Sequence, residues 1–92
     1  MPNRFTGHLS NYVRHRRYFL RKTQKTVAEA IGVTPDFIAL IEAGERRLDL
    51  DKVPLLADAL EVSRKALCQQ ALRERAPALY QQLFEQPQSA GA

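Results

Sequence analysis

Cysteine and long apolar runs are scarce in this chain of 92 residues. The single cysteine, Cys68, cannot form an internal disulfide, which fits a reducing compartment, and its apolar helical surroundings predict a packed thiol. No apolar stretch approaches the length that crosses a bilayer, and the N-terminus lacks the core of a signal peptide. We therefore expect a cytoplasmic protein that has no membrane contact.

Strand patterns and catalytic groupings are missing as well. No alternating apolar run bounded by hairpin turns predicts a β-strand. His8 and His15 lack a carboxylate or cysteine partner at useful spacing, and the sequence contains no metal-ligand cluster and no glycine-rich phosphate loop. These absences predict an all-α protein that is not an enzyme and that needs no metal, cofactor or small-molecule ligand.

The net charge of +4 is confined to one half of the chain. Residues 1–50 contain nine Lys or Arg and five Asp or Glu, whereas residues 51–92 contain five of each. A basic excess that is concentrated in one region indicates a polyanionic partner.

The basic half contains the strongest local pattern of the sequence. Two short amphipathic helices are expected over residues 24–31 and 35–43, separated by a turn at Gly32. Gly32 permits the positive φ that a tight turn needs, Thr34 can cap the second helix, and Pro35 suits its first position. A helix, a tight turn and a capped second helix form the layout that places one helix in a DNA major groove.

The remaining pattern completes one small helical domain. We expect a first helix from about Gly7 to Lys22, a fourth that Asp51 caps, a fifth that Ser63 caps, and a sixth segment that Pro77 opens. The predicted division is a flexible arm at 1–6, a DNA-binding domain at 7–73, a C-terminal helix at 74–86 and a disordered tail at 87–92. The expected core positions are Leu9, Tyr12, Val13, Leu20, Val27, Ala28, Ile31, Ile38, Ile41, Val53, Leu56, Ala57 and Leu60.

Helical geometry gives the helix at 35–43 an outer face. With Ile38 and Ile41 pointing inward, a rotation of about 100° per residue defines which side chains point outward. In a major groove Leu40 can contact thymine methyl groups and Asp36 can accept a hydrogen bond from cytosine. Alternatively, Leu40 and Phe37 cover neighbouring helices, and Asp36 only favours the helix dipole. The outward residues are Asp36, Ala39, Leu40 and Ala43, with Phe37 on one flank and Glu42 on the other.

Polar and basic residues flank this outer face. Thr23 is the natural cap of the helix at 24–31, and Gln24 and Lys25 lie at its start, where backbone N–H groups can bind a phosphate. Arg46 and Arg47 follow the second helix and can bind phosphates on its far side. Alternatively, these two arginines are solvated loop charges.

Three segments carry a resemblance to a known family: TQKTVAEAIGV at 23–33, TPDFIALIEAGERR at 34–47 and VPLLADALEV at 53–62. From about Leu9 to Leu67 the chain resembles the XRE-type helix-turn-helix domain of phage lambda repressor and Cro, which is widespread among bacterial and phage regulators. The resemblance implies a five-helix fold that binds operator DNA as a dimer.

The resemblance also assigns roles to single positions. It implies that the helix at 35–43, here called the reading helix, contacts the DNA bases. It also implies phosphate contacts at Gln24 and in the loop after this helix, and a structural ion pair between Arg17 and Glu42. Arg21 and Lys22 depart from the pattern, because relatives commonly carry a glycine and an apolar residue there. The positions that it assigns to base contacts are Thr34, Pro35, Asp36 and Leu40.

Four large apolar residues share one face of the expected C-terminal helix. Pairing of this face with a second copy predicts a homodimer that binds a palindromic operator, and hence a repressor of transcription. Alternatively, the helix folds back on its own core, or it binds another protein, as in an antitoxin that autoregulates its operon. RNA binding is disfavoured because no sheet offers an aromatic platform. The residues of this face are Leu79, Tyr80, Leu83 and Phe84.

Overall fold

The structure is a computed structural model that describes residues 9–85, and the predicted arm and tail lie outside these residues. Every regular element within this range is helical, which confirms the all-α prediction. The elements are α1 (Leu9–Phe19), α2 (Gln24–Ile31), α3 (Pro35–Glu42), a 3₁₀ turn η1 (Leu50–Lys52), α4 (Val53–Ala59), α5 (Arg64–Arg75), α6 (Pro77–Tyr80) and a π-helical turn η2 (Gln81–Glu85).

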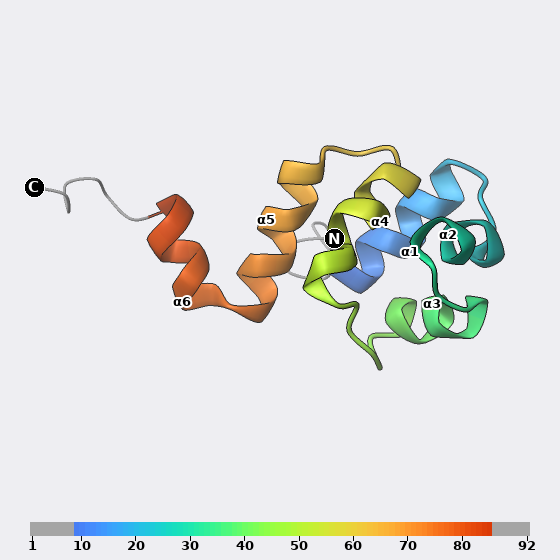
Figure 1. Ribbon diagram of the computed structural model, residues 1–92, viewed down its shortest axis with the longest axis horizontal. Helices are drawn as coiled ribbons and strands as arrows, with labels where there is room; N and C mark the ends of the chain where they lie inside the picture. The colour runs from blue at the N-terminus through green and yellow to red at the C-terminus, as the bar shows by residue number, and fades with distance from the viewer. Residues whose placement is uncertain (1–8, 86–92) are drawn as a thin grey trace, which may run out of the picture.

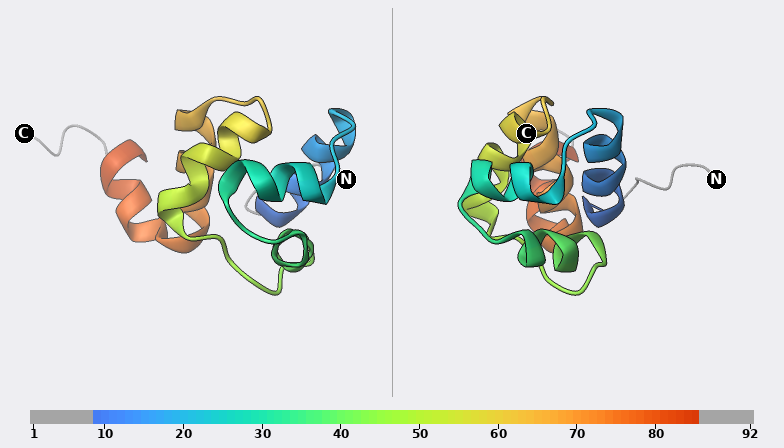
Figure 2. Two further views of the ribbon diagram at one scale, coloured as in Figure 1. Left: turned by 45° about the vertical axis from the view of Figure 1, so that its right-hand side comes forward. Right: turned by 90° about the vertical axis from the view of Figure 1, so that its right-hand side faces the viewer.

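The helices α1 to α5 form the body, and α6 with η2 extends from one end of it (Figure 1). In two further views α3 lies along one edge of this body, with no other helix beyond it (Figure 2). The reading helix predicted from the sequence therefore lies at the periphery, far from α6.

The core lies between these helices and follows the predicted pattern. Eleven of the thirteen expected core positions are buried, and Tyr12 is partly buried against the core. Leu20 is half-exposed rather than buried. Leu48, in the irregular connection between α3 and η1, is buried although no periodic pattern in the sequence predicts it. Cys68 packs partly buried against the same core.

Two helices end at non-glycine residues with a positive φ. Arg21 has φ 57°, and α1 ends at Phe19, earlier than predicted, because the Lys22 N–H donates to the Arg17 carbonyl at 3.0 Å. Glu61 has φ 58° in the equivalent turn after α4. L-residues adopt this conformation at a steric cost that glycine avoids. Arg21 therefore occupies, with strain, a position that suits glycine.

Side chains cap three of the helices as predicted. The hydroxyl groups of Thr23, Thr34 and Ser63 each accept a hydrogen bond from the backbone N–H three residues later. The predicted cap at Asp51 is wrong, because η1 precedes α4 and Asp49 instead accepts from the Asp51 N–H. These caps orient the start of α2 and the start of α3.

Two basic residues, one in the last turn of α1 and one just after it, bind the carbonyl groups at the C-terminus of α4. Arg16 donates to the carbonyls of Leu60 and Glu61 at 2.9 and 3.1 Å. Lys22 donates to the Ala59 carbonyl at 2.7 Å and pairs with the Glu61 carboxylate at 3.3 Å. Positive charge at a helix C-terminus is stabilising. This part of the basic run therefore has a structural role.

The C-terminal helix contacts α5 through Tyr80. The Tyr80 side chain is buried by its own chain, and its hydroxyl accepts a hydrogen bond from Arg73 at 3.1 Å. This placement corrects the expectation that Tyr80 lies on a face open to a second copy. Leu79, Leu83 and Phe84 remain exposed, at 49, 58 and 42%.

Candidate nucleic-acid interface

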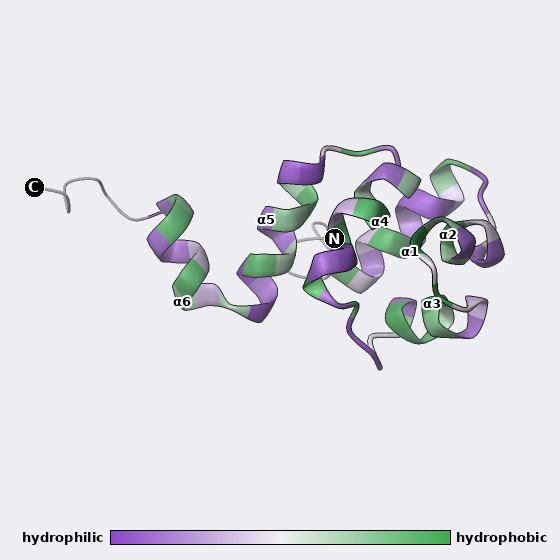
Figure 3. Cartoon of the chain, in the orientation of Figure 1, coloured by the Kyte–Doolittle hydropathy of each residue, from purple (hydrophilic) through white to green (hydrophobic). Residues whose placement is uncertain are grey.

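The outer side of α3 is open to solvent at its N-terminal end and partly open further along the helix. The cap Thr34, Pro35 and Asp36 are exposed, and Ala39 and Leu40 are half-buried. Ile38 and Ile41 are buried in the core, as the helical period requires. Phe37 is partly buried against the core, so it does cover neighbouring helices. Most of α3 is hydrophobic, and most of the connection after it is hydrophilic (Figure 3).

Glu42, the last residue of α3, joins three helices. Its carboxylate accepts hydrogen bonds from Arg17 Nε at 2.7 Å and Arg17 Nη2 at 2.9 Å. The side chains of Arg17 and Glu42 are only 8 and 2% exposed. The hydrogen bond to Glu42 raises the pKa of Arg17 above its ordinary value, so Arg17 stays charged. The structure thus brings together the two residues that the family resemblance pairs.

The start of α2 is tied to the same carboxylate. Gln24 Nε2 donates to Glu42 Oε1 at 3.2 Å, which fixes the Gln24 side chain between α2 and α3. Thr23 and Lys25, on either side of Gln24, are exposed. Lys25 forms no ion pair within residues 9–85. The capped start of α2 therefore presents a hydroxyl, an oriented amide and a cation next to the end of α3.

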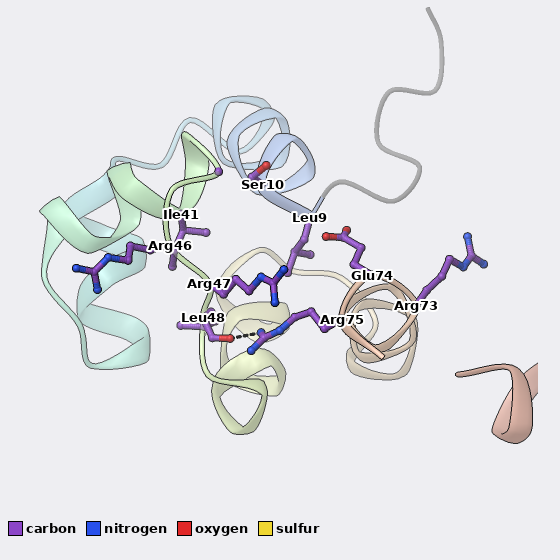
Figure 4. Close-up of a pocket in the computed structure, with 10 residues that line it drawn as sticks. Leu9, Ser10, Ile41, Arg46, Arg47, Leu48, Arg73, Glu74 and Arg75 are labelled. Atoms are coloured by element: carbon purple, nitrogen blue, oxygen red, sulfur yellow. Dashed lines mark hydrogen bonds between the residues drawn. The ribbon is translucent and has the colours of Figure 1, made fainter. Parts of the chain in front are cut away.

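The connection after α3 carries two exposed arginines with different directions. It begins at Gly44, whose φ of 78° favours glycine. Arg46 points away from α5, whereas Arg47 points into a pocket of about 580 Å³ between the connection and α5 (Figure 4). Arg75 borders this pocket and donates to the Leu48 carbonyl. Arg46 also lines this pocket, but its side chain is directed away from α5, whereas Arg47 is directed toward α5.

Arg14 is a residue near α3 that the predicted site omits. Its Nη2 donates to the Glu42 carbonyl at 3.3 Å, and its Nε lies 3.9 Å from Glu42 Oε1. The only signal in the sequence was its membership of the basic run that also contains Arg16 and Arg17. The run does not reveal which of its members lies beside α3.

Two other classes of feature are missing from the described residues. No group of three or more histidine, cysteine, aspartate or glutamate side chains within residues 9–85 is arranged to hold a metal ion. Over the same range, every helix is too short or too polar to span a membrane.

Comparison with known proteins agrees with this geometry. A sequence model described as helix-turn-helix matches residues 20–67, just over half of the chain. The match contains α2, the turn, all of α3 and the connection with its two arginines, and it ends in α5. No curated protein and no solved structure matches the chain.

Proposed function

The chain belongs to the helix-turn-helix family of the XRE type, which includes lambda repressor and Cro, and from this membership we propose a specific function. As a member it is a DNA-binding regulator. We propose that it is a repressor that binds a palindromic operator as a homodimer, with the outer side of α3 against the base edges. The proposed site of action is the cytoplasm, where binding to DNA would associate the protein with the nucleoid.

The exposure of α3 is the observation that carries this proposal. Backbone carbonyls and N–H groups inside a helix are satisfied, so only its outward side chains can read bases in a major groove. Ala39 is small enough to permit close approach, and Leu40 is apolar enough to contact a thymine methyl group. Asp36 and Pro35 lie at the N-terminal end of α3, the end that enters the groove in this class of motif.

The flanking cations support the same docking. Lys25 at the start of α2 and Arg46 in the connection both lie near the C-terminal end of α3, and both are exposed. The phosphate backbones border the groove that a reading helix occupies, so cations beside that helix can bind them. Thr23, Gln24 and Arg47 complete the proposed backbone contacts.

Dimerisation is proposed through the exposed apolar residues of α6 and η2. Leu79, Leu83 and Phe84 point to solvent, and they lie at the end of the molecule that is far from α3 (Figure 1). Pairing there would leave α3 open in both copies, as an inverted repeat requires. The alternative partner for this surface is a different protein, as in an antitoxin that autoregulates its operon.

Sedimentation of the full chain separates the two occupants. A dimer at micromolar concentration that becomes a monomer in Leu83→Glu supports pairing of two copies. A monomer of 10.5 kDa at the same concentration contradicts pairing and favours the different protein.

Selection of bound duplexes from a random pool tests the DNA-binding proposal. We expect enrichment of an inverted repeat whose half-site centres lie about one helical turn apart. Enrichment of a single unrepeated site would contradict the palindromic operator, and no enrichment at moderate salt would contradict sequence-specific binding.

A further inference from the structure

The three arginines of α1 have different surroundings although they lie within four consecutive positions. Arg16 binds the C-terminal carbonyls of α4, and Arg17 is buried against Glu42. Arg14 lies instead at the end of α3, where its Nη2 donates to the Glu42 carbonyl at 3.3 Å. Of the three, Arg14 is therefore the one that contacts the end of α3 from the solvent-exposed side.

The charges at this junction do not cancel. Arg17 hydrogen-bonds both oxygens of the Glu42 carboxylate, whereas Arg14 Nε is 3.9 Å from the nearer oxygen, beyond hydrogen-bond distance. One negative charge thus faces two guanidinium groups. The Arg14 side chain is 43% exposed, compared with 8% for Arg17, so the surplus positive charge lies at the surface.

The face of α1 that carries Arg14 lies beside the connection after α3. Ser10, one turn earlier on α1, has its Oγ 3.8 Å from the position that a Cβ on Gly44 would occupy. Gly44 begins the connection that carries Arg46. The carbonyl at a helix C-terminus attracts cations, so it fixes the guanidinium there without neutralising its charge.

We infer that Arg14 is a further contact to the DNA phosphate backbone, an inference that rests on the proposed function. A backbone borders the groove at each side of the reading helix, and a cation fixed to the end of that helix lies where a strand passes. The planar guanidinium, with N–H donors left over after its bond to Glu42, suits a phosphate oxygen pair.

The test compares Arg14→Gln with Arg16→Gln in the full chain. Arg16 is a matched control because it is two positions away and also binds helix C-terminal carbonyls, but those of α4. Affinity is measured against salt concentration on the selected operator and on an unrelated duplex of equal length. We expect Arg14→Gln to reduce the slope of log affinity against log salt by about 0.9 on both duplexes. Arg16→Gln should leave the slope unchanged and lower only the unfolding temperature.

A second variant separates charge from folding. Arg14→Lys keeps the cation and should retain the wild-type slope. An unchanged slope in Arg14→Gln, or an equal reduction in Arg16→Gln, would overturn the inference while leaving the proposed function in place. If the wild-type chain binds no duplex with a salt-dependent affinity, the proposed function and this inference both fail.

Discussion

Arg17 and Glu42 form a buried, two-pronged ion pair that fixes the end of α3 against α1. The two hydrogen bonds measure 2.7 and 2.9 Å, and Gln24 adds a third to the same carboxylate at 3.2 Å. Because α1, α2 and α3 each contribute one group, the angle of α3 relative to the other two helices depends on this cluster. We regard it as the support of the reading helix.

Replacement of Arg17 should lower the free energy of unfolding substantially. Arg17→Met leaves the Glu42 carboxylate, whose side chain is 2% exposed, without its main partner. Breaking a buried pair in this way destabilises proteins by about 3–5 kcal/mol, whereas replacing both partners with apolar residues is often nearly neutral. We expect urea unfolding to show a large loss in Arg17→Met and recovery of most of it in Arg17→Met/Glu42→Leu. A loss below about 1 kcal/mol in the single variant would contradict the supporting role.

The strained turn after α1 should be improved by glycine. Arg21→Gly removes a steric cost of about 1–2 kcal/mol and adds some freedom to the unfolded chain, so we expect a gain of up to about 1 kcal/mol. Glu61→Gly should gain less, because it also loses the ion pair with Lys22. Lys25→Gly is the control, since Lys25 is an exposed cation with helical φ, and it should destabilise. Thermal unfolding that ranks Arg21→Gly with Lys25→Gly would show that the turn is not strained.

The ion pair between Asp58 and Arg64 should make stability depend on pH. Arg64 donates two hydrogen bonds to Asp58, at 2.9 and 2.5 Å, and these hold the pKa of Asp58 below its ordinary value. The unfolded carboxyl titrates near pH ~4, so the pair stabilises the fold above that pH and its contribution is lost as pH falls through the lower folded pKa. Both side chains are exposed, so salt should weaken the effect.

Comparison of wild type with Asp58→Asn measures this contribution. The variant should unfold at lower denaturant concentration near neutral pH, and the difference should shrink as the pH falls below about 4. A difference that is constant over this range would show that the carboxylate charge does not stabilise the turn.

The two arginines of the connection should not contribute equally to DNA binding. The Arg46 side chain points away from α5, whereas the Arg47 side chain points toward α5 (Figure 4). We expect Arg46→Ala to weaken binding to all duplexes and to reduce the salt slope by about 0.9, with a smaller effect for Arg47→Ala. Lys65→Ala, an exposed cation at the start of α5, is the control and should leave the slope unchanged. A larger effect at Arg47 than at Arg46 would contradict this assignment.

Local signals predicted the elements that surround the reading helix. Thr34 and Pro35 define the start of α3, and Gly32 defines the turn before it, because each acts on backbone groups within three residues of itself. Asp49 and Asp51 show the limit of such signals. Either carboxylate can cap a helix, and the choice depended on a 3₁₀ turn that the sequence pattern does not reveal.

The contacts that each arginine of the basic run makes could be identified only from the tertiary structure. Arg14, Arg16 and Arg17 have the same chemistry, but the partners that distinguish them, on α3 and in the turn after α4, lie at least 25 positions away in the sequence. Tyr80 is a similar case, because its spacing with Leu79 and Leu83 fits one apolar face, yet its hydroxyl bonds Arg73 on α5. Helical periodicity alone does not distinguish a side chain that packs on its own chain from one that is open to a partner.

Leu40 provides the most direct test of whether the outer side of α3 reads DNA bases. The affinities of wild type and Leu40→Ala are measured at one salt concentration on the selected operator and on a scrambled duplex of the same composition. The account predicts a loss of about 1–3 kcal/mol on the operator and no change on the scrambled duplex. Equal losses on the two duplexes, or no loss on either, would contradict base reading by α3.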